Sequence, residues 1–345
     1  MIIVRTPLRI SFFGGGTDHP AWFNRNEPAA VLSTTINKYV YVQLRRLPAV
    51  FDFNYRIAWG ILEQVKTIRE IQHPVVRCLL EHYDRDGESG YEIIYNADLP
   101  SQTGLGSSSA FTVALLNAWF RNHERPCSKR FLAQEAIHVE QELLLETVGS
   151  QDQVAAAFGG LNRIDFFPSG DFSVSALHLP AERRDELQDS LMLFFTGFSR
   201  SAQAIESLKI ARYADMARSL REMHAMVGEG ERILANPRRD IGEIGDLLHQ
   251  AWMAKRSFHP SVSNGFIDEA YATARAFGAR GGKLLGAGGG GFLMMQVPPE
   301  RQAAVKEALS SLTHVPFRME REGASVVLYN PELASNYLAA DARVC

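Results

Sequence analysis

The sequence predicts an α+β fold in two lobes, an N-terminal lobe over residues 1–195 and a C-terminal lobe over residues 196–345. The chain has 345 residues and is 46% hydrophobic, which is enough to bury a large core in more than one lobe. Strands and helices interleave along it without internal repeats, low-complexity segments or a flexible linker. The pattern changes from strand-rich to helical at about residue 198.

The first lobe is predicted to begin with strands. Apolar runs bounded by turn residues predict them at residues 2–5, 9–13, 31–35, 39–44 and 91–96. Apolar residues at helical spacing predict helices over about 108–122 and 128–146. A turn at Pro168–Gly170 indicates a hairpin, and residues 191–196 are typical of a buried strand.

The second lobe is predicted to be mainly helical. Asn236 and Pro237 stop the first long helix, and Ser263 and Gly278 are expected to cap and close a later one. The predicted helices cover residues 201–234, 241–257, 264–277 and 299–312. Strands are expected at 292–297 and 326–329.

The composition argues against several classes of function. A net charge of −3 gives no general attraction to nucleic acid or anionic membranes. No apolar stretch approaches the ~20 residues of a membrane helix, and residues 1–5 lack the features of a signal peptide. Cys78, Cys127 and Cys345 form no Cys-x-x-Cys pair, so free thiols in a reducing cytoplasm are expected. The histidines lack the spacing of a zinc site.

The most informative segment is a glycine-punctuated loop that leads into a predicted helix. Gly104 and Gly106 permit a tight turn and a close approach of a ligand to the backbone. Ser107, Ser108 and Ser109 add hydroxyls and unpaired N–H groups at the helix start. Such a start binds phosphate, aided by the helix dipole. The alternative is an ordinary serine-capped helix. The loop lacks the Walker A pattern.

Two further glycine segments lie before and after this loop. Gly14–Gly16, followed by Thr17 and Asp18, ends the predicted strand 9–13. Gly286–Gly291 contains G-x-G-x-x-G, but a dinucleotide fingerprint must open a helix, whereas a strand is predicted to follow here. The alternative for this third segment is a tight hairpin with no ligand.

These three segments, in this order and at these separations, resemble the GHMP kinase superfamily, named for galacto-, homoserine, mevalonate and phosphomevalonate kinases. The resemblance extends from Thr6 to Gly291. Within it, residues 7–18 and 149–160 are most similar to heptose-7-phosphate kinases, whose relatives act on fucose-like and other hexoses. The resemblance implies an N-terminal lobe like ribosomal protein S5 domain 2, a ferredoxin-like C-terminal lobe, and an active site between them.

The resemblance also implies an ATP- and Mg²⁺-dependent phosphoryl transfer. Mg²⁺ prefers oxygen ligands, and Ser108 and Glu140 are the residues expected to bind it, with Glu142 as the alternative by proximity. Carboxylates on an amphipathic helix can also be merely solvated. The residues expected to hold the ATP phosphates are Gly104, Leu105, Gly106, Ser107, Ser108 and Ser109.

Asp152 matches the family's catalytic aspartate and is expected to act as general base or to orient the acceptor hydroxyl. Its alternative role is to cap the helix that follows. Arg9 matches a family position held by lysine or arginine, and its permanent charge could bridge Asp152 and the moving phosphoryl group. The alternative for Arg9 is a structural ion pair.

Substrate recognition is assigned to the first and third glycine segments. By resemblance, Asp18 accepts hydrogen bonds from two sugar hydroxyls, whereas its simpler role is an Asx-turn. Gly16, Thr17, Gly288 and Gly289 are also assigned to the substrate. A phosphorylated sugar needs a further cation, and spacing does not choose among Arg25, Arg163, Lys255, Arg256 and Lys283.

The resemblance therefore implies a cytoplasmic kinase for the anomeric hydroxyl of a manno-heptose 7-phosphate, which would feed the synthesis of nucleotide-activated heptose for a surface polysaccharide. One alternative is a fucose- or galactose-type 1-kinase. Another is a non-catalytic sugar-sensing protein, against which the combination of Arg9, Glu140 and Asp152 argues. The expected partner is a small sugar phosphate rather than nucleic acid or membrane, and both a monomer and a homodimer remain open.

Overall fold

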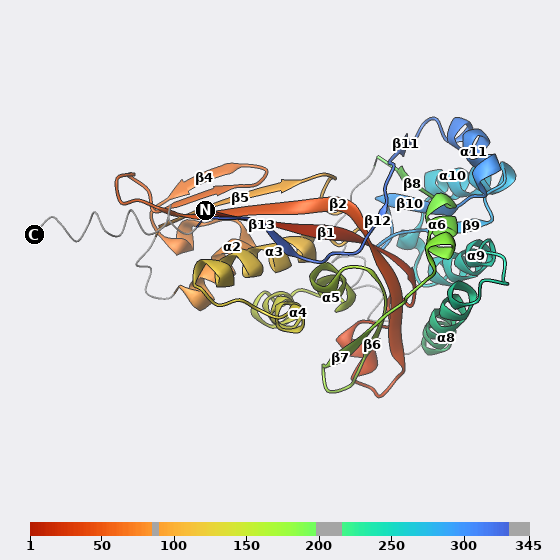
Figure 1. Cartoon of the computed structure of the whole chain (residues 1–345), viewed down its shortest axis with the longest axis horizontal. Helices are drawn as coiled ribbons and strands as arrows, with labels where there is room; N and C mark the ends of the chain where they lie inside the picture. Colours follow the sequence, from red (N-terminus) through yellow and green to blue (C-terminus); the bar gives the residue numbers. More distant parts are fainter. Residues whose placement is uncertain (85–89, 198–215, 331–345) are drawn as a thin grey trace, which may run out of the picture.

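The computed structural model describes residues 1–84, 90–197 and 216–330, and the described elements form two lobes (Figure 1). The first lobe is built on a sheet with the strand order β13-β1-β2-β5-β3-β4, in which β6 and β12 also pair with β2, and β7 with β6. Only β3 and β5 run parallel among these pairs. Its strands are β1 (Ile2–Phe13), β2 (Ala29–Leu47), β3 (Tyr55–Ala58), β4 (Leu62–Val65), β5 (Gly90–Ala97), β6 (Leu161–Phe166), β7 (Phe172–Ala176), β12 (Met319–Glu320) and β13 (Ser325–Tyr329).

Helices cover one face of this sheet (Figure 1). The central one, α3, packs against β1 and β2 and is buried along most of its length, which explains its nearly uniform apolar sequence. The helices of this lobe are α1 (Pro20–Phe23), α2 (Pro74–Tyr83), α3 (Ser107–Asn122), α4 (Lys129–His138) and α5 (Gln151–Phe158), with a short helical turn at Ile68–Glu70.

The second lobe contains an antiparallel sheet in the order β11-β8-β10-β9, with helices packed around it (Figure 1). Its strands are β8 (Leu191–Phe195), β9 (Gly281–Leu284), β10 (Phe292–Gln296) and β11 (Thr313–His314). Its helices are α6 (Ala181–Asp189), α8 (Ala217–Ala235), α9 (Glu243–Arg256), α10 (Gly265–Ala276) and α11 (Gln302–Ala308), with short turns at Pro260–Val262 and Pro299–Arg301. The predicted α+β class is confirmed.

The strands predicted at 2–5 and 9–13 form one continuous strand, β1, which passes through Pro7. Proline has no N–H to donate, but β13 pairs with β1 only at Ile2–Arg5, so at Pro7 the strand needs a partner on one side alone. The register shifts between Pro7 and Leu8, opposite Asn37 and Lys38 of β2. This bulge likewise joins the two segments predicted for β2 into one strand.

Several predicted helix ends differ from the structure. The helix predicted over 128–146 is regular only to His138, and Val139–Leu143 continues as wider π-helical turns. The cap of α10 is Asn264, whose side chain accepts from the Ile267 N–H, whereas Ser263 donates to Asp268. The helix predicted over 201–234 lies partly outside the described residues, which contain it from Ala217 onward.

The division into domains 1–195 and 196–345 stays a prediction, and the sheets do not follow it. Strand β8 ends at Phe195 but belongs to the second sheet, while β12 and β13 return to the first. None of the described helices has the length and apolar character to cross a membrane. Cys78 and Cys127 are free thiols, and Cys345 lies outside the described residues.

Candidate active site

A cavity of about 410 Å³ is lined by residues of both lobes. Strand β1 contributes Arg9 and Ser11 to its wall, and the first glycine loop contributes Gly15, Gly16 and Asp18. The second lobe contributes Met223 of α8, Lys255 of α9, and Lys283, Gly286 and Ala287 from β9 and the loop after it. The cavity therefore brings together residues from all three glycine segments.

The predicted phosphate loop, residues 104–109, forms one wall of the cavity. Gly106 lies at the N-cap of α3 with φ +74°, a left-handed conformation that suits glycine. Ser107, Ser108 and Ser109 follow in the first turn and line the cavity together with Gly104 and Gly106. Leu105 instead points away and is buried, and its carbonyl accepts the backbone N–H of Arg9 at 3.0 Å.

The third glycine loop packs directly on the phosphate loop, backbone against backbone. A Cβ at Gly286 would lie 2.4 Å from the Cα of Gly104, and one at Gly104 would lie 2.5 Å from the carbonyl oxygen of Leu285. A Cβ at Gly291 would lie 2.2 Å from the carbonyl oxygen of Thr103. These glycines therefore allow the two lobes to meet at the phosphate loop.

Arg9 and Asp152 form a bidentate pair at the floor of the cavity. The Nε of Arg9 donates to Oδ1 of Asp152 at 2.7 Å, and its Nη2 donates to Oδ2 at 2.8 Å. Its Nη1 donates to the carbonyl of Gly104 at 2.5 Å. The Arg9 side chain is 5% exposed and that of Asp152 25%, so the pair is held in a site of low water content that remains open toward the cavity.

Glu140 lies on the π-helical segment and is fully buried. Its Oε2 accepts from Ser109 Oγ at 2.8 Å and from Gln153 Nε2 at 2.5 Å, while Oε1 has no hydrogen-bond partner among the described residues. Burial raises the pKa of Glu140 to about 7. A buried carboxylate oxygen without a partner, beside the serine hydroxyls of the phosphate loop, fits a hard divalent cation. Glu142 instead is 72% exposed and pairs with His138.

Asp18 ties the first glycine loop to the start of α5, the helix that carries Asp152. Its Oδ1 accepts from the Gly16 N–H at 2.9 Å, and its Oδ2 accepts from Gln151 Nε2 at 2.9 Å. Its carbonyl accepts the Ser150 N–H at 2.9 Å. A Cβ at Gly149 would lie 2.0 Å from Asp18 Oδ2, so this approach requires glycine.

Some of the residues assigned to the substrate do not line the cavity. The Thr17 hydroxyl is buried and donates to the carbonyls of Gly14 and Ala30, so it shapes the loop. Gly288 and Gly289 contact Val262, and the Gly289 N–H donates to its carbonyl at 2.9 Å.

Of the five cations considered for a sugar phosphate, Lys255 and Lys283 line the cavity and are largely buried. Arg25 is not among the lining residues. Arg163 and Arg256 form ion pairs with Asp165 and Asp268 elsewhere. Of these five residues, only Lys255 and Lys283 line the cavity.

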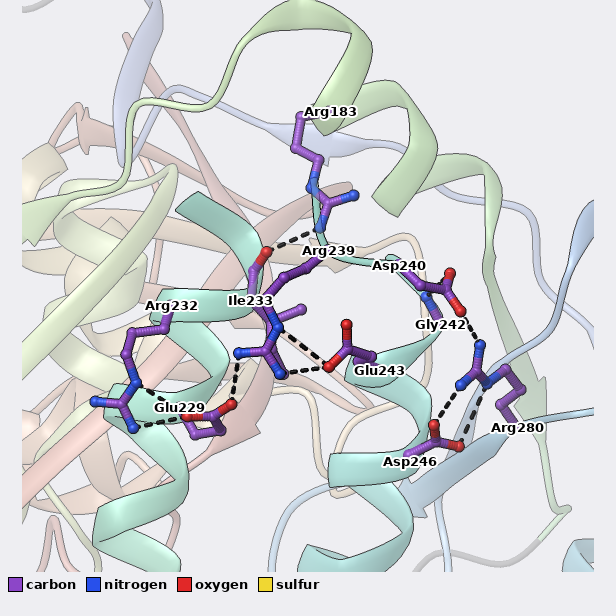
Figure 2. Close-up of polar contacts among 10 residues, drawn as sticks. All are labelled: Arg183, Glu229, Arg232, Ile233, Arg239, Asp240, Gly242, Glu243, Asp246 and Arg280. Atoms are coloured by element: carbon purple, nitrogen blue, oxygen red, sulfur yellow. Dashed lines mark hydrogen bonds and ion pairs between the residues drawn. The ribbon is translucent and has the colours of Figure 1, made fainter. Parts of the chain in front are cut away.

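Helix α8 forms a wall of the cavity over the first glycine loop. Met223 of this helix lines the cavity, and a Cβ at Gly14 would lie 2.8 Å from Val227. Figure 2 shows how the helix is fixed at its far end: Arg183 donates to the carbonyl of Ile233, and Arg239 bridges Glu229 of α8 and Glu243 of α9. The buried Arg183 supplies a donor for the last turn of α8, where carbonyls lack helical partners.

The sequence analysis missed an aromatic end of the cavity. Trp59, His73, Tyr95 and Phe111 line it, with ring centroids 4.8 Å apart for Trp59 and His73 and 4.7 Å for His73 and Phe111. Burial lowers the pKa of His73 to about 4, so its ring is neutral at pH 7. Trp59 and Ile61, on the turn between β3 and β4, remain exposed despite their size, and this exposure is visible only in the folded chain.

Comparisons with known proteins agree with this geometry. The chain matches the GHMP kinases N terminal domain over residues 69–160 and the GHMP kinases C terminal domain over residues 233–314. It is 29% identical to a D-glycero-alpha-D-manno-heptose 7-phosphate kinase of Campylobacter jejuni, over 89% of this chain and 93% of that protein. It is 24% identical to a galactokinase of Pyrococcus furiosus, over 89% of this chain and 92% of that protein.

A solved structure described as a D-glycero-D-manno-heptose 1-phosphate kinase from Bacteroides thetaiotaomicron has the same fold. It superposes with a TM-score of 0.78 at 24% identity, over 96% of this chain and 100% of that one. Both family domains, in the expected order, and the fold of both lobes are therefore present, and the chain belongs to the GHMP kinase family.

Proposed function

We propose that this kinase transfers the γ-phosphoryl group of ATP to the anomeric hydroxyl of a manno-heptose 7-phosphate, giving the 1,7-bisphosphate. The observation that carries the proposal is the bidentate Arg9–Asp152 pair, placed between the phosphate loop and the first glycine loop. Phosphoryl transfer requires positioning and charge stabilisation more than covalent chemistry, and this arrangement offers both.

The nucleotide would lie along the wall made by α3 and the aromatic end. The first turn of α3 lines the cavity, and N–H groups at a helix start have no partners within the helix, so they can donate to phosphate oxygens. Trp59, His73 and Phe111 present aromatic rings at this end of the cavity, and a purine ring stacks on aromatic faces. Gly106 keeps the backbone close to the phosphates.

Ser108 and Glu140 would hold Mg²⁺. When bound, Mg²⁺ supplies charge neutralisation at the phosphate oxygens. Gln153 and Ser109 fix the Glu140 carboxylate by donating to its Oε2, which leaves Oε1 as the atom available to the cation.

Asp152 would orient the acceptor hydroxyl and take its proton. Both of its oxygens already accept from Arg9, but each retains a second lone pair, so one can accept from a hydroxyl in the cavity. Arg9 holds the carboxylate in place and keeps a positive charge beside the oxygen that gains negative charge during transfer.

A phosphorylated acceptor is supported by Lys255 and Lys283, two largely buried lysines in the cavity wall. Lys255 donates to the carbonyls of Leu284 and Gly286, and Lys283 donates to that of Phe12, so both ammonium groups are held near the acceptor space. The similarity to the heptose 7-phosphate kinase supports the same assignment. The product would then serve the synthesis of a nucleotide-activated heptose for a surface polysaccharide.

The second candidate is a hexose 1-kinase, favoured by the similarity to the galactokinase. The test is an assay of ADP release with heptose 7-phosphate, heptose, mannose, fucose and galactose. A clear preference for heptose 7-phosphate supports the proposal, and equal activity on heptose and its 7-phosphate contradicts it. Absence of ADP release with every sugar would favour a non-catalytic sugar-binding protein.

The same assay identifies the phosphate-binding lysine. Lys255→Met and Lys283→Met are compared on heptose and heptose 7-phosphate. The variant that loses the phosphate contact should raise the KM for the 7-phosphate about ten- to a hundredfold and leave the KM for heptose unchanged.

A further inference from the structure

Two polar side chains in the cavity wall have no role in the chemistry described so far. Ser11 is 6% exposed, and its Oγ has no hydrogen-bond partner among the described residues. The Oε1 of Gln151 is also buried and without a partner in the part of the chain that the structure describes. Both residues line the cavity. A buried polar atom left without a partner costs free energy, so a ligand that supplies the missing hydrogen bonds gains from both positions.

Ser11 lies on β1 between the reacting centre and the first glycine loop. Side chains alternate along a strand, so Ser11 shares a face with Arg9 and lies about 6.6 Å along the strand from it. Gly14–Gly16 follow directly. A sugar whose anomeric hydroxyl faces Asp152 and whose ring reaches Asp18 would pass over this hydroxyl.

Gln151 lines the cavity next to Asp152, at the start of α5. Its Nε2 donates to Oδ2 of Asp18 at 2.9 Å. A carboxylate oxygen accepts, so the amide nitrogen must face Asp18 and the amide oxygen must face away from it. The orientation of the side chain is thereby fixed, and Oε1 is left as an acceptor.

Gln153, two residues further along α5, has the same side chain but does not hydrogen-bond to Asp18. Its Nε2 donates to Glu140 rather than to Asp18, and it is not among the residues that line the cavity. The first three residues of α5 thus face three different parts of the site: Asp18, Arg9 and Glu140.

We infer that Ser11 and Gln151 bind hydroxyl groups of the acceptor sugar, with Gln151 Oε1 accepting from one hydroxyl and Ser11 Oγ exchanging a hydrogen bond with another. This inference rests on the proposed function, because it takes the acceptor to be a sugar. Sugar hydroxyls both donate and accept, so they match an amide oxygen and a serine hydroxyl. The two residues would set which hydroxyls of the sugar are required.

The experiment pairs protein variants with modified substrates. Ser11→Ala and Gln151→Met are assayed with the accepted sugar and with its monodeoxy derivatives, one hydroxyl removed at a time. Each variant should raise the KM for the parent sugar about three- to tenfold with little change in kcat or in the KM for ATP. With the wild-type enzyme, removal of a bound hydroxyl carries a penalty, an increase in KM over that of the parent sugar. With each variant, one derivative should no longer show this increase, because the hydroxyl that it lacks is the one whose protein partner has been removed.

Three comparisons separate this role from a structural one. Ser33→Ala is the matched control, because Ser33 lies opposite Ser11 on β2, is equally buried and is not a cavity-lining residue; its kinetics should equal those of the wild type. Ser11→Thr keeps the hydroxyl and should keep the wild-type pattern of penalties. Gln153→Met should raise the Mg²⁺ requirement and leave the pattern of sugar penalties unchanged.

The inference is overturned if, for every monodeoxy derivative, the increase in KM over that of the parent sugar is the same in the wild type, in Ser11→Ala and in Gln151→Met. It is also overturned if Ser11→Ala changes the KM for ATP more than that for the sugar. Failure of the proposed function looks different, because wild-type enzyme would then act equally on heptose and heptose 7-phosphate, or release no ADP with any sugar. Should Gln151→Met not fold, Gln151→Leu is used in its place.

Discussion

Replacing Glu140 by glutamine should stabilise the metal-free protein above neutral pH, although it removes a proposed metal ligand. Glu140 is 1% exposed, and burial raises its pKa from an ordinary 4.5 to about 7. The folded state therefore binds a proton more tightly than the unfolded chain. The free energy of unfolding must fall as the pH rises from about 4.5 to about 7.

The size of the effect follows from the two pKa values. At about 1.4 kcal/mol for each pKa unit, the ionised Glu140 destabilises the metal-free fold by about 3 kcal/mol above pH 7. Glutamine has nearly the same shape and stays neutral, and its amide oxygen can still accept from Ser109. Glu140→Gln should thus match the wild type near pH 4.5 and exceed it by about 3 kcal/mol at pH 8.

Urea unfolding in a chelating buffer at pH 5 and pH 8 measures this difference. Glu142→Gln is the matched control, since Glu142 lies two residues away but is 72% exposed, and the variant should stay within about 0.5 kcal/mol of the wild type at both pH values. Adding Mg²⁺ and ADP should stabilise the wild type at pH 8 more than Glu140→Gln. An equal difference between wild type and Glu140→Gln at both pH values would refute the reasoning.

Three further substitutions test the rest of the site. Asp152→Asn should lower kcat at least a hundredfold while ATP affinity, measured by titration, stays nearly unchanged; turnover within about tenfold of the wild type would remove Asp152 from the mechanism. Gly106→Val should abolish ATP binding without loss of cooperative thermal unfolding, because its Cβ would lie 3.2 Å from both Arg9 Cγ and Asp152 Oδ2 in a left-handed conformation. Normal ATP affinity in that variant would reduce the loop to a helix cap. Asp18→Ala should raise the sugar KM about ten- to a hundredfold with the KM for ATP little changed, and a defect on the ATP side would assign the first glycine loop to the nucleotide.

Local pattern was sufficient for most of the fold. Helices such as α3 follow from apolar spacing and a glycine at the start, both of which are visible within a few residues. The prediction of two separate strands at 2–5 and 9–13 was wrong because tolerance of Pro7 within a strand depends on how far β13, some 320 residues away, pairs along β1. The placement of β12 and β13 in the first sheet likewise depends on pairing between the two ends of the chain.

The candidate site likewise contains features that the sequence predicted and features that only the folded structure reveals. The resemblance to the family implied that Arg9, Asp152 and the phosphate loop lie together, and the structure places them in contact. It did not predict that Thr17 and Gly288 lie outside the cavity wall, or that Ser11 Oγ and Gln151 Oε1 have no hydrogen-bond partner among the described residues. Those properties depend on which groups the folded neighbours leave unsatisfied, and a short motif does not contain that information.

The pairing of β1 with β13 has a consequence for biosynthesis. The strand that carries Arg9 is translated about 310 residues before its partner at Ser325–Tyr329. At 5–20 residues per second, one edge of β1 waits roughly 15–65 s for that partner. An open strand edge is a template for incorrect pairing, so nascent chains should depend on ribosome-associated chaperones during this interval. A chain stalled before residue 325 should remain sensitive to protease at its N-terminal strand, and release of a few more residues should protect it.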